Sequence, residues 1–295
     1  MLNNYVQHWL LFKKYTSIKQ IVYIHLINFL SVYTKDEKIL WIKKGKLPLY
    51  QGTDGKKILY ISSVALQLAS SDNSKVTGII RAIAAHLAAY GELFHVKVVP
   101  PALIHIELID STLAVWLHNL TVGETSLEGI GGGGDGETGR WPDGENYNNK
   151  LFKIQYAHAR CCSLLRLADR EGLIQLIDNS TEVLGLLSTQ PIPWLDCDQK
   201  LRLYQGDEVR LMHLLVKMVD DLVFPDSNTS VNWMTTALKL SEAFESFWCN
   251  CRIWGEVKIN SLELAQARLG LLIVTQLVLR SVLESKLGVF APVEL

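Results

Sequence analysis

The stretch that decides the fold of this chain is Gln155-Tyr156-Ala157-His158-Ala159-Arg160-Cys161-Cys162-Ser163-Leu164-Leu165-Arg166. Its apolar residues recur at intervals of three and four, which predicts an α-helix with one buried face. The predicted buried arc consists of Ile154, Ala157, Cys161, Leu164, Leu165 and Ala168. Tyr156 and Arg160 lie four residues apart on nearly the opposite side. This pair suits stacking on a nucleotide base or contact with a partner. Packing under a neighbouring helix is the alternative, and periodicity alone favours it.

Composition indicates a globular chain without a general attraction for nucleic acid. Of the 295 residues, 48% are hydrophobic and 20% are charged, and the length allows two domains. The formal net charge is −1, whereas nucleic-acid-binding proteins usually carry a basic excess. Residues 1–110 hold 13 basic against 7 acidic residues, and residues 151–295 hold 14 against 17. Attraction for phosphate is therefore expected mainly from the N-terminal part.

The cysteines and the apolar runs predict a cytoplasmic protein. The five cysteines are odd in number and form no Cys-x-x-Cys pair, so we expect reduced thiols rather than disulfides or a zinc site. Polar residues interrupt both long apolar runs, at 18–32 and 269–283, so no membrane span is expected. No secretory signal is indicated, because Lys13 and Lys14 follow the first apolar patch. The sequence predicts no metal, no cofactor and no catalytic residues.

The N-terminal part is predicted to be an α+β module. Residues 1–17 have no clear period and are expected to be a poorly ordered extension. The patterns then predict helices over 18–33, 61–70, 75–90 and 111–120, with an extended segment at 38–51 and strands at 94–99 and 104–109. We assign residues 18–121 to this module.

A glycine-rich segment marks the predicted boundary between two domains. Eight glycines lie between residues 129 and 144, among Asp, Glu and Asn. This composition is typical of a flexible linker, which we place at 122–149. A phosphate-binding loop is the alternative, but no Gly-Lys-Ser/Thr follows and no apolar strand comes directly before it.

Residues 150–295 are predicted to form an all-helical bundle, so the whole chain is mainly α. Beyond the first helix, periodic runs predict helices over 171–187, 208–222, 232–254 and 262–287. The last of these is apolar almost all round, which indicates a helix at the centre of the bundle.

Several polar side chains of the bundle are candidates for function. Trp248 and Arg252 repeat the spacing of Tyr156 and Arg160, which suits either base stacking or a cation–π contact inside the bundle. His158 falls at the edge of the buried arc, so we expect a half-buried structural histidine, with a role as base or ligand as the alternative. The acidic pairs Asp207-Glu208 and Asp220-Asp221 are interpreted as solvated surface or helix caps.

Three motifs of the bundle resemble the DALR anticodon-binding domain of arginyl-tRNA synthetases. Gln-Tyr-Ala-His-Ala-Arg with Cys-x-Ser-Leu-Leu-Arg, at 155–166, is similar to the first helix of that domain. Phe-Trp-Cys-Asn-Cys-Arg-Ile, at 247–253, resembles its aromatic-rich segment. The segment from Ala267-Arg268-Leu269 to the Leu-Gly-x-x-Ala-Pro tail at 287–292 resembles its terminal helix. The resemblance implies an anticodon-binding fold and tRNA as a partner.

The N-terminal part resembles the additional domain of the same synthetases. The similar segments are 61–69, 80–87 and 99–105, and in that family the domain touches the tRNA elbow. The family's Gly-Pro-Gly-Phe-Ile-Asn is here Pro-Pro-Ala-Leu-Ile-His, which weakens the expectation of tRNA contact at that strand. Between the two parts the synthetases have a catalytic domain. This sequence has the glycine-rich segment there, without His-x-Gly-His or Lys-Met-Ser-Lys, so we expect no aminoacylation.

The resemblance therefore predicts a non-catalytic relative that binds the anticodon stem-loop of a tRNA. The candidate RNA contacts are Tyr156, His158, Arg160, Trp248, Arg252 and Arg268. The alternative is a module that has been repurposed to bind a protein such as a synthetase. Retained arginine–tRNA ligase activity is a further alternative, which the missing motifs disfavour.

Overall fold

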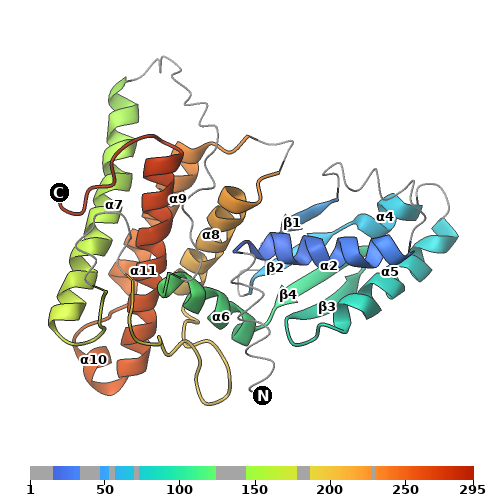
Figure 1. The fold of residues 1–295 in the computed structure, drawn as a ribbon, viewed down its shortest axis with the longest axis horizontal. Coiled ribbons are helices and arrows are strands. Elements are labelled where there is room, and N and C mark those ends of the chain that lie inside the picture. Colours follow the sequence, from blue (N-terminus) through green and yellow to red (C-terminus); the bar gives the residue numbers. More distant parts are fainter. Residues whose placement is uncertain are drawn as a thin grey trace.

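The computed structural model describes residues 16–33, 47–52, 57–69, 73–123, 144–177, 187–226 and 230–295. A small antiparallel sheet occupies the N-terminal part and helices make up the rest, as predicted (Figure 1). Most of the predicted extension at 1–17 and of the predicted linker at 122–149 lies outside the described residues. Residues 144–149, the last of the predicted linker, are described and form the start of a helix. The rest of both segments, and the domain boundaries, stay predictions.

The N-terminal part is built on four antiparallel strands in the order β1-β2-β4-β3. The strands are β1 (Leu49–Gln51), β2 (Leu59–Ser62), β3 (Phe94–Val99) and β4 (Leu103–Leu108). β3 and β4 match the two strands that the alternating pattern predicted, to within one residue, and they pair as an antiparallel hairpin. Its turn contains two prolines, which cannot donate hydrogen bonds to a ladder.

β2 corrects the prediction of a helix over 61–70. The strand extends to Ser62, and the helix α4 (Val64–Ala69) begins only after it. β2 lies between β1 and β4, and three of its four residues are buried. A strand that is buried on both faces gives a continuous apolar run instead of an alternating one, and such a run cannot be told from a buried helix.

Three further helices complete this part of the chain. They are α2 (Ile18–Tyr33), α5 (Asn73–Ala88) and α6 (Asp110–Thr121). α2 and α5 lie over one face of the sheet, and α6 leads from β4 toward the helical part (Figure 1). The Ser17 hydroxyl accepts a hydrogen bond from the Gln20 N–H at 3.0 Å, so Ser17 caps α2.

All the long elements of the C-terminal part are helices. They are α7 (Gly144–Arg170), α8 (Gly206–Val223), α9 (Trp233–Asn250), α10 (Glu256–Asn260) and α11 (Leu262–Ser285). The predicted helix at 171–187 is wrong over its described residues 171–177, which form turns and a bridge from Leu176 to Ser188. Leu173 and Ile174 are buried there, so their apolar character reflects a loop packed against the bundle.

α11 is the central helix, as predicted. It contacts α6, α7, α8, α9 and α10, and most of its side chains are buried. By length and composition α11 is the one helix among the described residues that could cross a membrane, but 72% of its most apolar window is buried inside the protein. Such burial is typical of the core helix of a globular protein.

The two parts of the chain are in contact. α6 packs against α11, and α2 packs against α8. The Leu201 N–H donates to the Asp110 carboxylate at 3.2 Å, and the Ser188 N–H donates to the Thr121 carbonyl at 2.9 Å. α6, which the sequence assigns to the α+β module, therefore also covers the helical core.

Two acidic residues that were interpreted as surface or caps are buried. Glu208 accepts a hydrogen bond from the Gln205 N–H at 2.8 Å and completes the capping box of α8. The prediction of a helix cap is therefore confirmed for Glu208, and the prediction of a solvated surface residue is wrong. Asp220 is only 4% exposed and faces the N-terminal part. Its partners lie at least 160 residues away, a distance at which sequence spacing carries no signal.

Candidate nucleic-acid interface

α7 provides the frame of the candidate site. All six residues of its predicted apolar arc are buried, which confirms the face assignment. On the other side Phe152, Tyr156 and Leu167 are 57%, 44% and 37% exposed. Gly172, with φ of +68°, ends the helix in the left-handed conformation that favours glycine. The exposed face of α7 is thus a fixed, partly apolar ridge.

The central contact of the site joins α7 to α9. The Arg160 guanidinium lies over the ring of Trp248, with Cζ 5.3 Å from the ring centroid. The sequence paired Arg160 with Tyr156 and Trp248 with Arg252 along single helices. The structure instead brings Arg160 of α7 against Trp248 of α9, so the contact joins two helices. Both side chains are half-buried, so part of each is exposed to solvent.

Two aromatic residues that sequence reasoning missed extend this contact. Phe152 stacks on Tyr156 with ring centroids 6.3 Å apart and planes 26° from parallel. Trp254 meets Trp248 edge to face at 5.7 Å. We call Phe152, Tyr156, Arg160, Trp248 and Trp254 together the aromatic surface. Phe152 lies one turn before Tyr156, so the helical period could have identified it, whereas the position of Trp254 depends on the chain path after α9.

The Glu171 carboxylate fixes the Trp254 end of the aromatic surface. Glu171 accepts hydrogen bonds from the Trp254 indole N–H at 3.0 Å and from the Lys258 ammonium at 2.7 Å. The hydrogen bond from Lys258, and then that from Trp254, lower the pKa of Glu171. The Trp254 ring is therefore held in place by a group at the end of α7.

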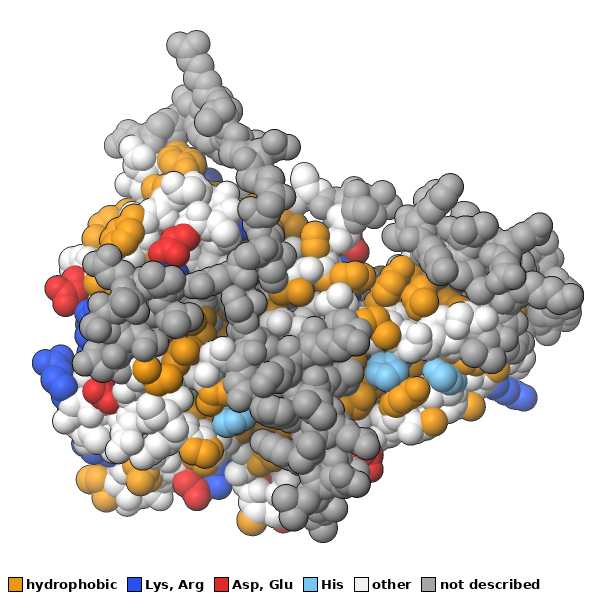
Figure 2. Space-filling view, in the orientation of Figure 1, with side chains coloured by type: hydrophobic (Ala, Val, Ile, Leu, Met, Phe, Trp, Pro, Cys, Tyr) orange, Lys and Arg blue, Asp and Glu red, His pale blue; other side chains and the backbone are white. Residues whose placement is uncertain are grey.

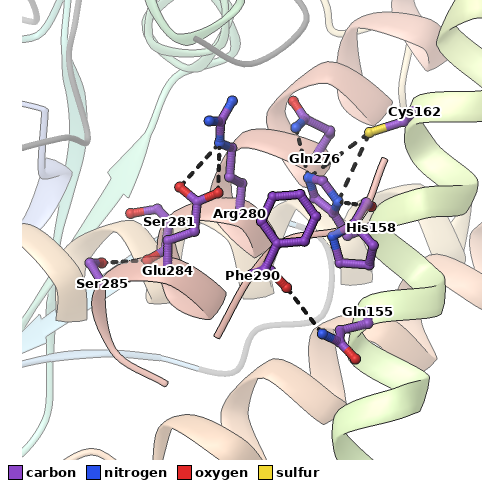
Figure 3. A network of polar contacts seen from close by, with 10 residues as sticks. Gln155, His158, Cys162, Gln276, Arg280, Ser281, Glu284, Ser285 and Phe290 are labelled. Carbon is purple, nitrogen blue, oxygen red and sulfur yellow. Dashed lines mark hydrogen bonds and ion pairs between the residues drawn. The ribbon is translucent and has the colours of Figure 1, made fainter. Parts of the chain in front are cut away.

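His158 does not belong to this surface, because it is only 1% exposed (Figure 3). Its Nδ1 lies 2.8 Å from the Pro292 carbonyl oxygen, and its Nε2 lies 2.8 Å from the Gln276 side-chain nitrogen. This arrangement fits the neutral ring with hydrogen on Nδ1. Burial lowers the pKa of His158, and the hydrogen bond to Pro292 partly opposes this. The predicted structural histidine fits these contacts, with deeper burial than expected.

His158 shares its face of α7 with the groups that hold the C-terminal segment. The Gln155 amide donates to the Phe290 carbonyl at 3.0 Å (Figure 3), and Arg166 donates to Glu294 at 3.1 Å. The segment after α11 therefore lies along α7, on a different side from Tyr156.

Arg268 is also buried, and it holds the domain together. Its side chain is 3% exposed and its Nε donates to the Glu208 carboxylate at 2.7 Å. A second nitrogen donates to the carbonyl of Arg252. The network links α8, α11 and the segment after α9. The Arg252 side chain itself is exposed and remains free to reach a phosphate.

The electrostatics around the site are mixed. On the face drawn in Figure 2, acidic and basic side chains of the described residues are interspersed over the helical part. Within the described ranges, no group of three or more His, Cys, Asp or Glu side chains is arranged to hold a metal ion. The site consists of aromatic rings, one guanidinium stacked on a ring, and scattered cations. These groups suit contact with unpaired bases more than with a regular duplex.

Residues 154–295 match the sequence family described as the DALR anticodon binding domain. The C-terminal half of this chain is a DALR anticodon-binding domain. The DALR domain begins within α7 and includes all of α8 to α11. All six candidate residues lie in it, and the structure leaves four of them on or near the surface: Tyr156, Arg160, Trp248 and Arg252.

Curated relatives of the DALR domain are arginine–tRNA ligases. The chain is 31% identical over 149 residues to the arginine–tRNA ligase of Synechococcus sp. (strain JA-3-3Ab), which covers 50% of the chain and 23% of the relative. It is 28% identical over 149 residues to the enzyme of Ruminiclostridium cellulolyticum, covering 50% and 22% respectively. It is 31% identical over 149 residues to that of Salinibacter ruber, with the same shares. The chain thus spans less than a quarter of the length of these relatives. No solved structure matches it significantly.

Proposed function

We propose that this protein binds tRNA through its DALR domain, and that the aromatic surface receives unpaired bases of the anticodon stem-loop. The single observation that carries the proposal is the Arg160–Trp248 stack, flanked by the exposed rings of Phe152 and Tyr156. Aromatic side chains and guanidinium planes are the groups on which proteins stack the splayed bases of RNA loops. The position of this surface in an anticodon-binding domain supports the same conclusion.

Stacking rather than charge supplies the affinity in this proposal. Residues 151–295 carry 14 basic against 17 acidic residues, so general phosphate attraction is weak. Arg252, which is exposed beside the end of α9, is assigned a phosphate contact. His158 and Arg268 are removed from the RNA interface, because both side chains are buried and hydrogen-bonded within the protein.

The test is a binding titration of the full chain with a labelled anticodon stem-loop RNA, followed by fluorescence anisotropy at several salt concentrations. Tyr156→Ala and Trp248→Ala should each weaken binding about 5- to 100-fold, since a stacked base contributes roughly 1–3 kcal/mol. Tyr156→Phe should retain most of the affinity, because it keeps the ring. Tyr204→Ala is the matched control, since Tyr204 is 76% exposed and lies on the segment before α8.

Two results would contradict the proposal. One is the absence of binding at low salt. The other is an equal effect of Tyr156→Ala and Tyr204→Ala, which would mean that exposed tyrosines in general, and not the aromatic surface, affect the assay. A steep salt dependence that Arg252→Gln does not reduce would move the phosphate contact elsewhere.

A protein-interaction module is the second candidate. Phe152, Tyr156 and Leu167 are exposed apolar side chains on one side of α7, and apolar side chains at such spacing also contact partner helices. A partner such as a synthetase would bury these side chains. If purified protein recovers only proteins from an extract, and Tyr156→Ala releases them while stem-loop RNA does not bind, this second function replaces the first.

Aminoacylation is not part of the proposal. The sequence lacks His-x-Gly-His and Lys-Met-Ser-Lys, the motifs that hold ATP phosphates in the synthetases it resembles. The relatives that are arginine–tRNA ligases are more than four times as long as the matched segment. ATP–pyrophosphate exchange with arginine should stay at background, and exchange above background would contradict this. The proposal includes a cytoplasmic location, which is consistent with a role in tRNA binding.

A further inference from the structure

Asp220 is a buried carboxylate at the contact between α8 and the N-terminal part. Its Oδ1 accepts hydrogen bonds from the Ser17 hydroxyl at 2.8 Å and from the Lys19 N–H at 3.0 Å. Its Oδ2 accepts a short hydrogen bond from the Tyr60 hydroxyl. Asp220 thus caps the first turn of α2 and holds the centre of β2 at the same time.

Around Asp220, other polar and aromatic contacts join the same parts of the chain. The Lys19 ammonium lies 2.5 Å from Asp226, the Tyr23 and Phe224 rings are 5.1 Å apart, and the Gln51 amide donates to the His213 carbonyl at 3.3 Å. α6 attaches the same N-terminal part to α11 independently of α8. The sheet and α2 are therefore joined to the DALR domain by α6 and, separately, by the group of contacts centred on Asp220.

The charges near Asp220 are already paired with other groups. On α2, Lys19 pairs with Asp226, and on α8 itself Lys217 pairs with Asp221 at 3.1 Å. β2 contributes Tyr60, whose pKa is raised by its own burial and by Asp220. Burial raises the pKa of Asp220 to about 6, although Tyr60, Lys19 and Ser17 stabilise its charged form. When protonated, the carboxyl can donate to either hydroxyl, because a hydroxyl accepts as well as donates.

We propose that Asp220 is a proton-sensitive latch, which docks α2 and β2 against α8 and holds them more tightly as its carboxyl takes up a proton. If the latch opens, the carboxyl returns to water and regains its ordinary acidity. The docked form therefore binds more protons than the open form between about pH 4 and pH 6, and docking strengthens as the pH falls through this range. Across this pH range the equilibrium constant for docking should rise about a hundredfold, which follows from the difference between the two pKa values of Asp220. The proposal does not depend on RNA binding.

The first test follows the Lys19 backbone N–H in the full chain by ¹⁵N NMR, because this group donates directly to Asp220. Its chemical shift should titrate with a midpoint near pH 6. Asp220→Asn, which keeps the acceptor oxygen, should abolish this titration. Asp221→Asn is the matched control and should leave it unchanged. A midpoint below pH 4.5, or a titration that survives in Asp220→Asn, would overturn the proton-sensitive latch.

The second test asks whether Asp220 joins the two parts or stabilises the whole fold. In Asp220→Ala at neutral pH, amides of α2 and β2 should lose hydrogen-exchange protection at least tenfold, while those of α7 and α11 stay within twofold. The radius of gyration from X-ray scattering should rise, and Asp221→Ala should leave all three readouts unchanged. Equal loss of protection in every element, or no loss in α2 and β2, would overturn the latch.

Discussion

Replacing Arg268 with Met should destabilise the DALR domain strongly, because it leaves the Glu208 carboxylate buried without its counter-charge. Glu208 is fully buried and receives one N–H from Gln205 besides the Arg268 guanidinium. The substitution also removes the donor to the Arg252 carbonyl. Removing one partner of a buried ion pair costs about 3–5 kcal/mol.

The size of the charge contribution can be separated from that of packing by a double-mutant cycle. Glu208→Gln removes the negative charge but keeps a side chain that can complete the capping box. In that background Arg268→Met no longer strands a carboxylate, so it should cost only about 1–2 kcal/mol, which is the order of a lost hydrogen bond. The coupling energy between the two positions is then about 2–3 kcal/mol.

Urea unfolding followed by far-UV circular dichroism measures all four corners of the cycle. If Arg268→Met costs the same in both backgrounds, within about 0.5 kcal/mol, the buried ion pair does not stabilise the domain as described. RNA binding adds a second check. Under conditions where Arg268→Met is folded, its affinity for the stem-loop should equal that of the unchanged chain, since Arg268 is 2% exposed. A loss of affinity in the folded variant would return Arg268 to the RNA interface.

Two further predictions concern packing and pH. Gly270→Ala should lower the free energy of unfolding by about 1–3 kcal/mol, because the new Cβ would lie 2.5 Å from the Trp194 ring. Gly206→Ala is the control in thermal melts, since its Cβ would have no atom within 4 Å. Equal effects of the two substitutions would show that the Trp194 contact is not the cause. His158 has a lowered pKa in the folded chain, so the unfolded chain binds more protons and stability falls as the pH drops below about 6.5. Asp220 has the opposite sign, so the His158 effect is measured in an Asp220→Asn background, where His158→Gln should flatten the acid limb of urea midpoints against pH. An unchanged acid limb would contradict the effect assigned to His158.

Features with a local signature could be predicted from the sequence. The buried arc of α7, the hairpin of β3 and β4, and the apolar central helix α11 each follow from a period that is visible within one element. The identity of the domain came from short motifs in α7, at 247–253, and in α11 with the tail that follows it. α7 and α11 belong to the DALR domain, whereas the hairpin of β3 and β4 lies before it.

The chemistry of the site depends on contacts that spacing does not encode. Arg160 was paired with Tyr156 by the helical period, yet its partner Trp248 comes from another helix. Arg268 was predicted as an RNA contact from the family resemblance, and its burial depends on Glu208 sixty positions earlier. β2 escaped notice because a strand buried on both faces has no alternation.

Photo-crosslinking can show whether unpaired RNA bases stack on the aromatic surface. The full chain would be irradiated in complex with bulk tRNA, and the crosslinked peptides identified by mass spectrometry. We expect crosslinks within residues 150–160 and 248–254, which disappear when Tyr156 and Trp248 are both replaced by Ala. Crosslinks confined to the N-terminal sheet, or unchanged in the double variant, would contradict this stacking.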